Sequence, residues 1–372
     1  MRESRRYNRY PTPRVVDPLI LSNREFDVMN MDAPKNVRLT VVMPVHNDMP
    51  YLPQAIQSIL DQSYREFVFL IGDDESTDGS SECIRGFAAR DSRIQLLQKN
   101  AKRLGPVGSS NWVAQHAQTP LVARMDADDV CGRERLAAQI SVMDHNADAV
   151  LVGTLYSTID SRGSVVLKPD LSILTNGFRY PVAHGSIMYR KAVFDEVGGY
   201  RNGTDYYEDT DLYLRMARQG SLLVVTDSLF SYRHGLTSAR LNDDPQIVEN
   251  ALERNFCGQT AASGTGTGAN GRVTPRVMIS MGLLRLWSGQ NPGILLRMVK
   301  RMRITPIHLS MLALLWAVTS TLCPWGMRRF LILRRDVRNW LLAGRIRPGH
   351  VYRWYIGRPA MDLGPLRPAD TV

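Results

Sequence analysis

Apolar positions along this chain alternate between short continuous runs and helical spacings. The runs predict strands at 37–43, 67–71, 94–97, 121–125 and 149–154. Apolar residues three and four positions apart predict helices between them, at 52–60, 80–90, 109–117 and 133–145. Strands that alternate with helices are typical of a mostly parallel, doubly wound α/β sheet. Ligands of such sheets bind beyond the carboxyl ends of the strands, which is where candidate chemistry is expected.

The composition limits the class of protein. The chain has 372 residues, of which 44% are hydrophobic and 22% charged, which excludes a disordered chain, a collagen-like fibre and a disulfide-rich miniprotein. Its 4 cysteines lie far apart without a Cys-x-x-Cys pair, so neither a zinc site nor a disulfide framework is expected and a reducing compartment fits best. The polar, basic start of the chain does not resemble a secretory signal.

The net charge of +10 is unevenly distributed. Residues 1–272 carry 30 Lys/Arg and 33 Asp/Glu, a net charge of −3, whereas residues 273–372 carry 16 Lys/Arg and 3 Asp/Glu, a net charge of +13. A Gly/Ser/Thr-rich linker at 258–272 lies where the balance changes. We therefore expect a flexible basic arm at 1–36, a globular domain at 37–257 and a basic, partly apolar, mainly helical region at 273–372.

One acidic motif directly follows the predicted strand 121–125. Asp126 and Asp128 point to the same side if the segment is extended. Arg124 shares that side and could pair with a carboxylate or a phosphate. Neighbouring carboxylates repel each other unless a cation neutralises them, and Mg²⁺ prefers such oxygen ligands together with phosphate oxygens and water. A solvated surface turn is the alternative interpretation.

Two further acidic motifs need separate interpretations. In the segment 73–80, helix capping explains Thr77 to Ser80 but leaves the doublet Asp73-Asp74, whose carboxylates could accept hydrogen bonds from a base or a ribose. Glu208-Asp209 is either an acidic helix N-terminus, favoured by the helix dipole, or a catalytic pair.

Together, these motifs resemble family 2 glycosyltransferases, which have the GT-A fold. The resemblance covers about residues 37–240 and identifies 37–257 as a GT-A catalytic domain. It rests on the order and spacing of the segments 44–47, 73–80, 123–129, 133–139, 184–190, 198–200 and 207–215.

The resemblance implies a role for each matching residue. The nucleotide-sugar-binding residues would be Pro44, His46, Asn47, Asp73, Asp74, Arg124, Asp126 and Asp128. Asp126 and Asp128 would be the pair that binds Mn²⁺ or Mg²⁺, with Asp128 as the direct ligand, and His234 would be a further contact to the metal or to the diphosphate. Asp209, paired with Glu208, would be the general base. Apart from the resemblance, His184 and Tyr207 are candidate acceptor contacts, with a packed or solvated side chain as the alternative for His184. One base and one metal suffice for a single displacement that inverts the anomeric centre.

Two features depart from the family pattern. Glu75 stands where Gly is common, which would narrow the turn near the base. The segment 105–111 lacks the usual Arg, which weakens a role of this loop in binding the diphosphate. Trp112 and Tyr206-Tyr207 either stack on sugar rings or belong to the core.

The basic region contains 24 residues, 304–327, without Asp, Glu, Lys or Arg. This stretch is long enough to cross a bilayer, but its polar residues and prolines leave a membrane-associated or re-entrant helix, a buried helix and a true span as alternatives. Further on, Arg334, Arg335, Arg338, Arg345 and Arg347 alternate with Trp340, Leu341 and Leu342. This mixture suits a helix at an anionic interface, with a solvated basic surface as the alternative.

The sequence therefore predicts a metal-dependent, inverting glycosyltransferase with a nucleotide-diphosphate sugar donor. The acceptor would be a glycan or lipid-linked glycan of bacterial exopolysaccharide, capsule or lipopolysaccharide synthesis, at the inner face of the cell membrane. A nucleotidyltransferase acting on sugar phosphates is a rival, although no Gly-rich, Lys-containing loop follows the first strand. A nucleic-acid-binding protein is another rival, but the tail carries no recognised DNA or RNA motif, so we expect no nucleic-acid partner.

Overall fold

The computed structural model describes most of residues 37–233 and parts of the C-terminal region. The described residues are 26–28, 37–99, 103–171, 174, 182–202, 208–233, 333, 336–337, 339–342, 345–355 and 358–367. The predicted linker at 258–272 and the apolar stretch at 304–327 lie outside them. Within the described part, no helix is both long enough and apolar enough to cross a membrane.

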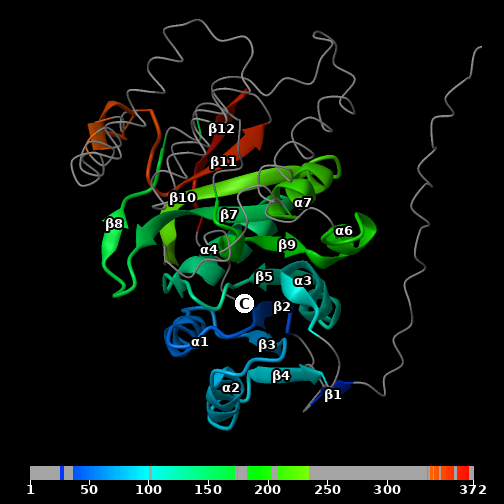
Figure 1. Ribbon diagram of the computed structural model, residues 1–372. Coiled ribbons are helices and arrows are strands. Elements are labelled where there is room, and N and C mark those ends of the chain that lie inside the picture. The colour runs from blue at the N-terminus through cyan, green and yellow to red at the C-terminus, as the bar shows by residue number, and fades with distance from the viewer. Residues whose placement is uncertain are drawn as a thin grey trace, which may run out of the picture.

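Four parallel strands form the N-terminal half of the sheet. In spatial order they are β4 (Ile94–Lys99), β3 (Phe67–Asp73), β2 (Leu39–Val45) and β5 (Leu121–Arg124). The connections contain α1 (Leu52–Leu60), α2 (Ser80–Ala88) and α3 (Gly105–Gln115). Both faces of β3 are buried, which accounts for its continuous apolar sequence. The predicted α/β fold with a parallel core is confirmed (Figure 1).

The second half of the sheet is mixed. The short strand β9 (Met188–Arg190) lies antiparallel between β5 and β7 (Ala149–Ile159), and β7 runs parallel to β10 (Ser221–Arg233). Two small strands, β6 (Val130–Cys131) and β8 (Val165–Leu167), pair with β10 and β7. At the opposite edge, β1 (Phe26–Val28) pairs antiparallel with β4, so part of the predicted flexible arm forms a strand.

The C-terminal region contributes to the same sheet. Strands β11 (His350–Tyr355) and β12 (Arg358–Pro365) form an antiparallel pair, and β11 pairs with β10. The side chains of Val351, Tyr352 and Trp354 are buried there. The described part of the basic region therefore contains strands as well as helical residues, and its strands extend the main sheet beyond β10.

Helices cover both faces of the sheet (Figure 1). Helices α1, α2 and α4 (Arg135–His145) bury their apolar sides in one core cluster, and α3, α6 (Lys191–Glu196) and α7 (Glu208–Met216) bury theirs in the other. Helix α3 approaches β3 so closely that a Cβ on Gly72 would lie 2.2 Å from a methyl carbon of Val113. Trp112 is buried against the same glycine, so it belongs to the core.

Candidate active site

Two loops at the carboxyl ends of β2 and β3 are joined by hydrogen bonds. The Nδ1 atom of His46 donates to the carbonyl oxygen of Asp74 (2.7 Å), and the Thr77 amide donates to Oδ1 of Asn47 (2.7 Å). Asn47 and Glu75 both have positive φ angles, 57° and 63°, which side chains other than glycine rarely adopt. The loops therefore hold each other in an unusual backbone conformation, as binding loops often do.

The two residues of the first acidic doublet have different surroundings. Asp74 is buried, and its carboxylate accepts hydrogen bonds from the amides of Leu104 (2.9 and 3.1 Å) and Gly105 (2.9 Å), where α3 begins. Asp73 accepts one bond from the Ser76 amide (3.0 Å) and one from the Ser81 hydroxyl. Asp74 thus caps α3, whereas Asp73 fixes the loop that follows β3. Pro44 lies in β2 beside Gly72 of β3.

The pairing expected from residue parity is present beyond the end of β5. Nε of Arg124 donates to Oδ1 of Asp126 (2.9 Å), and its Nη1 donates to Oγ of Ser110 on α3 (2.9 Å). Burial would lower the pKa of Arg124, but the Asp126 carboxylate, followed by Tyr200 and Glu208, holds it above its usual value. Arg124 is therefore a permanent cation between the sheet and α3.

Several carboxyl groups meet around the same turn. Burial, and then the charge of Asp126, raise the pKa of Asp128 to about 6, although the backbone amide and Arg233 oppose the shift. Burial also raises the pKa of Asp48 to about 7; the His46 amide opposes this, whereas the charges of Asp128 and Asp126 add to it. We call Asp48, Asp126, Asp128 and Asp129 the carboxylate cluster. Burial and mutual repulsion raise the pKa values of Asp48, Asp128 and Asp129, so a cation near these three groups would be favourable.

Arg233, the last residue of β10, ties the turn to the rest of the domain. It is buried, and its guanidinium donates to the carbonyl oxygens of Asp128 (2.7 Å) and Asp160 (2.9 Å) and to Oε1 of Gln54 (2.7 Å). The Arg233 amide donates to Oδ1 of Asp129 (2.6 Å). These bonds fix the backbone that carries Asp128.

The buried carboxyl group of Asp129 lowers the stability of the folded chain, because it is only partly hydrogen-bonded. Its carboxylate is buried, and Oδ2 has no hydrogen-bond partner among the described residues. Burial and then the charges of Asp128 and Asp126 raise the pKa of Asp129 well above its ordinary value. An uncompensated buried carboxyl group of this kind is rare and commonly marks a functional site.

Helix α7 brings the third acidic motif to the same place. The charge of Glu208 acts on both Arg124 and Tyr200, and so does that of Asp126. Asp209 is buried in the first turn of the helix, and its Oδ1 accepts a bond from the Thr210 amide (2.6 Å). The structure thus brings Glu208-Asp209 and the Asp126 turn to the same side of the sheet.

His184 lies beside this group. Its Nε2 atom forms a hydrogen bond with the Tyr200 hydroxyl (2.7 Å). The next residue, Gly185, is so close to Asp126 that an added Cβ would lie 3.0 Å from Oδ2. Two of the predicted site residues, Tyr207 and His234, lie outside the described part of the chain, as does Tyr206.

The donor atoms suit a divalent cation that takes most of its ligands from substrate. The described residues include no group of three His, Cys, Asp or Glu side chains placed to hold an ion alone. Mg²⁺ and Mn²⁺, however, commonly bind one or two carboxylates together with phosphate oxygens and water. The carboxylate cluster provides such oxygens, and the raised pKa values of Asp48 and Asp128 favour a bound cation there. The residues therefore fit the expected ion.

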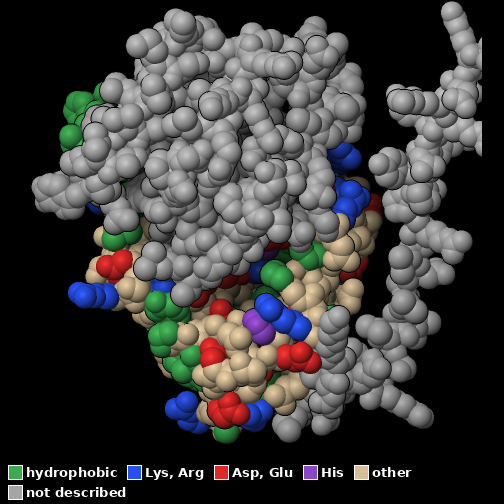
Figure 2. Space-filling model, viewed as in Figure 1, with side chains coloured by type: hydrophobic (Ala, Val, Ile, Leu, Met, Phe, Trp, Pro, Cys, Tyr) green, Lys and Arg blue, Asp and Glu red, His purple; other side chains and the backbone are tan. Residues whose placement is uncertain are grey.

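Sequence reasoning did not identify several residues of this site. Asp48 follows the His46-Asn47 motif directly, but its role emerges only when the loop folds over the Asp126 turn. Tyr200 is the last residue of the segment 198–200, and Arg233 directly precedes the predicted ligand His234. Both therefore lie in or beside motifs that the sequence analysis used. Acidic side chains are visible on the face around β2 and β3 in Figure 2.

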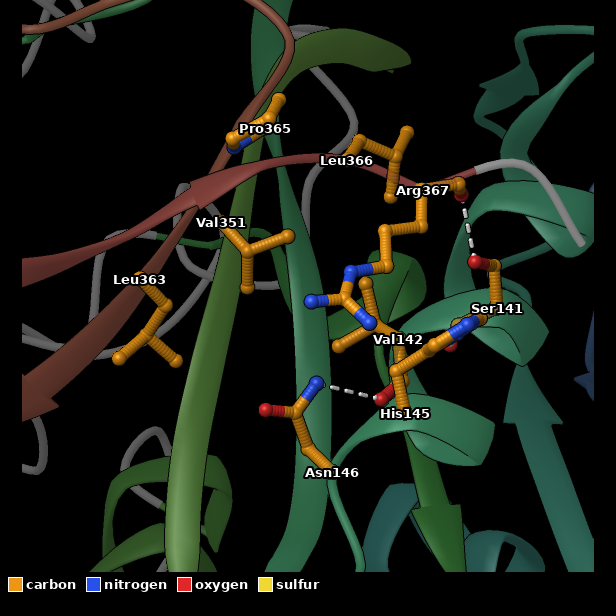
Figure 3. A pocket seen from close by; sticks show the side chains of 9 residues that line it. All are labelled: Ser141, Val142, His145, Asn146, Val351, Leu363, Pro365, Leu366 and Arg367. Atoms are coloured by element: carbon orange, nitrogen blue, oxygen red, sulfur yellow. Dashed lines mark hydrogen bonds between the residues drawn. The ribbon is translucent and has the colours of Figure 1, made fainter.

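A separate, partly open pocket of about 80 Å³ lies elsewhere (Figure 3). It lies between α4 and the β11–β12 pair, with the Arg367 side chain pointing into it and the Arg367 carbonyl accepting a bond from Ser141 (2.6 Å). None of the predicted site residues lines it. The pocket is a gap in the packing of the C-terminal strands against α4.

Comparison with known proteins gives consistent results. A family model described as Glycosyl transferase family 2 matches residues 40–201. EpsE of Bacillus subtilis, named as a glycosyltransferase, is 34% identical over 225 residues, which cover 58% of this chain and 80% of EpsE. The uncharacterized glycosyltransferase MJ1057 of Methanocaldococcus jannaschii is 27% identical over 216 residues, which cover 55% of this chain and 73% of MJ1057.

Longer relatives and one solved structure complete the comparison. The chain spans only 24% of an uncharacterized glycosyltransferase of Rickettsia bellii and 26% of the uncharacterized protein y4gI of Sinorhizobium fredii. The mannosyltransferase PcManGT from Pyrobaculum calidifontis, solved with GDP-Man and Mn²⁺, superposes with a TM-score of 0.53 at 16% identity. The match covers 85% of this chain and 90% of PcManGT, and it shows a shared fold.

Proposed function

Since the chain belongs to glycosyltransferase family 2 and has the GT-A fold, we propose that it is a metal-dependent, inverting transferase. It takes a sugar from a nucleoside-diphosphate sugar and joins it to an acceptor hydroxyl. PcManGT, of the same fold, was solved with such a donor and with Mn²⁺.

One observation carries this proposal. Asp126 and Glu208 lie 82 positions apart in sequence, yet their charges act on the same two groups, Arg124 and Tyr200. A transferase needs its diphosphate site and its general base close together, so that the acceptor hydroxyl can reach the anomeric carbon of the bound donor. The convergence of the Asp126 turn and the N-terminus of α7 supports such a combination of sites.

The loops after β2 and β3 would bind the nucleotide. Pro44 lies near the end of β2, His46 and Asn47 lie in the loop after it, and Asp73 is the last residue of β3. Asp73 is the better candidate for the base and ribose, because the Asp74 carboxylate is already used by the amides that begin α3. Each oxygen of Asp73 accepts only one bond among the described residues, so it retains capacity for a ligand.

Asp128 would be the direct metal ligand, and Asp126 and His234 would be further candidates. When bound, a divalent cation neutralises the charge that develops on the departing diphosphate. The chain's own part is to hold the oxygens in place: Arg233 fixes the Asp128 backbone and Arg124 fixes the Asp126 carboxylate.

Asp209 would act as the general base, and Glu208 beside it would help to orient the acceptor. The acceptor oxygen attacks the anomeric carbon while the bond from that carbon to the diphosphate oxygen breaks. The hydroxyl proton passes to the Asp209 carboxylate. A single displacement of this kind inverts the configuration at the anomeric carbon.

The acceptor would be a glycan or lipid-linked glycan of a bacterial exopolysaccharide, capsule or lipopolysaccharide. His184 and Tyr207 are the candidate acceptor contacts, and the bond from His184 to Tyr200 places that histidine next to Arg124. Synthesis of such glycans from nucleotide sugars would place the enzyme in the cytoplasm, at the inner face of the cell membrane.

A donor panel with purified protein and Mn²⁺, read as nucleoside diphosphate release, tests the proposal. We expect Asp209→Asn to lower transfer by about two to four orders of magnitude, the range for a lost general base. Donor binding should remain, because Asn keeps the Oδ1 that accepts the Thr210 amide. The matched control is Asp195→Asn, which removes an exposed carboxylate paired with Lys191 on α6. Full activity of Asp209→Asn would contradict the assignment.

A further inference from the structure

A short helix in the basic C-terminal region exposes an apolar stripe. The described residues of 333–342 are helical, and the side chains of Leu333, Val337, Trp340 and Leu341 are 61%, 48%, 75% and 63% exposed. Spacings of four, three and one residues place these side chains on one face of the helix, within about 100° of arc. Four large apolar side chains gathered on one exposed face usually mark an interaction site.

The other side of this helix is attached to the catalytic domain. The side-chain Nδ2 of Asn339 donates to the carbonyl oxygen of Pro169 (2.7 Å), and its Oδ1 accepts a bond from the backbone amide of Leu171 (3.2 Å). Leu342 packs against the core cluster that contains α3, α6 and α7. The apolar stripe therefore faces outward, because the opposite side of the helix contacts the rest of the protein through Asn339 and Leu342.

The fold holds the stripe in a fixed place. Leu342 is followed by buried Ile346 and then by β11, which pairs with β10 of the catalytic sheet. The helix is orange in Figure 1, at the end of the sheet opposite β1, and Figure 2 shows hydrophobic side chains at that place. Anything that binds the stripe is thereby positioned relative to the active site.

The charge of the surrounding sequence indicates the partner. Residues 328–347 contain 7 arginines and one acid, Asp336. A second copy of this chain would bring two sets of arginines together, which is unfavourable. An anionic lipid surface instead offers phosphates to the arginines and an apolar interior to the stripe, and tryptophan favours that boundary.

We propose that the apolar stripe, Leu333, Val337, Trp340 and Leu341, docks this protein on anionic lipid bilayers. The helix lies flat on the surface, with the stripe inserted among the acyl chains near the headgroups. Docking does not depend on the proposed transfer reaction, so the two can fail separately.

Flotation of the full-length protein with vesicles tests the docking. We expect binding to phosphatidylcholine vesicles that contain about 30% phosphatidylglycerol, and much weaker binding to phosphatidylcholine alone. The double variant Trp340→Glu/Leu341→Glu should lower binding to the anionic vesicles about tenfold or more. Both side chains are exposed, so the unfolding temperature and nucleoside diphosphate release should stay as in the wild type.

The matched control is Met361→Glu, which places the same acid at a 45% exposed apolar side chain of β12. It should bind anionic vesicles as the wild type does. Equal binding of the double variant and the wild type would overturn the proposal, as would equal binding of the wild type to neutral and anionic vesicles. A wild-type dimer that the double variant makes monomeric, without vesicle binding, would assign the stripe to a second copy instead.

Discussion

Replacing Asp128 by Asn should stabilise the metal-free protein. The pKa of the Asp128 carboxyl is raised from 3.8 to about 6, so ionising it is harder in the folded chain than in the unfolded chain. At about 1.4 kcal/mol per unit, this corresponds to at most about 3 kcal/mol of folding free energy. That stability is present below the unfolded pKa and is lost as the pH rises through the folded pKa. Asn resembles the neutral carboxyl and avoids the loss.

Urea unfolding in the presence of a chelator measures this effect. At about pH 4 the wild type and Asp128→Asn should have nearly the same free energy of unfolding. Near pH 8 the variant should be more stable by about 1–3 kcal/mol, because removing this charge also relieves Asp48 and Asp129. Mn²⁺ should then stabilise the wild type but have little effect on the variant.

Glu82→Gln is the matched control, since it removes an exposed carboxylate paired with Arg85 on α2. It should change the free energy of unfolding by less than about 0.5 kcal/mol at either pH. If the difference between the wild type and Asp128→Asn does not depend on pH, or if the variant is the less stable protein near pH 8, the carboxylate cluster is not short of positive charge and the reasoning is refuted.

Three further substitutions test other parts of the site by urea unfolding and donor binding. Asp74→Ala should cost about 2–3 kcal/mol of stability, because the amides of Leu104 and Gly105 at the start of α3 lose their acceptor. Glu75→Gly should raise stability by about 0.5–1 kcal/mol, because glycine relieves the positive φ of 63°. Arg233→Met should cost about 3 kcal/mol and weaken Mn²⁺-dependent donor binding, because Asp128 and Asp160 carbonyls and Gln54 lose their donor.

The sequence pattern predicted the parallel half of the sheet better than the mixed half. The strands of the parallel half are continuous apolar runs bounded by turns, and each was expected within a few residues of its place. Strand β9 has only three residues, too few to show a period, and its position between β5 and β7 depends on long-range pairing. Strands β11 and β12 carry Arg353 and Arg358 in a basic region, which favoured helix at a membrane over strand.

The site was predictable where neighbours in sequence are neighbours in space. The parity of Arg124 and Asp126 along an extended segment is enough to predict their ion pair, which the structure shows. The bonds from Arg233 to the Asp128 and Asp160 carbonyls and to Gln54 require β10 to lie beside β7 and β6. The sequence around Arg233 does not indicate that strand order. The departure at Glu75 also gains a physical meaning: its positive φ explains why glycine is favoured there.

The carboxylate cluster also predicts how donor binding depends on metal and pH. A diphosphate is an anion, and Asp48, Asp126 and Asp128 repel it unless a cation lies between them. Calorimetry should therefore detect tight donor binding in the presence of Mn²⁺. With a chelator in place of the ion, the donor affinity should be lower by about tenfold or more. Because the pKa values of Asp128 and Asp48 are about 6 and about 7, protons compete with the metal, and the affinity for Mn²⁺ should rise as the pH rises from about 5 to about 8. Donor affinity that is equal with and without the ion, at both ends of this range, would contradict the need for a cation between the carboxylates and the diphosphate.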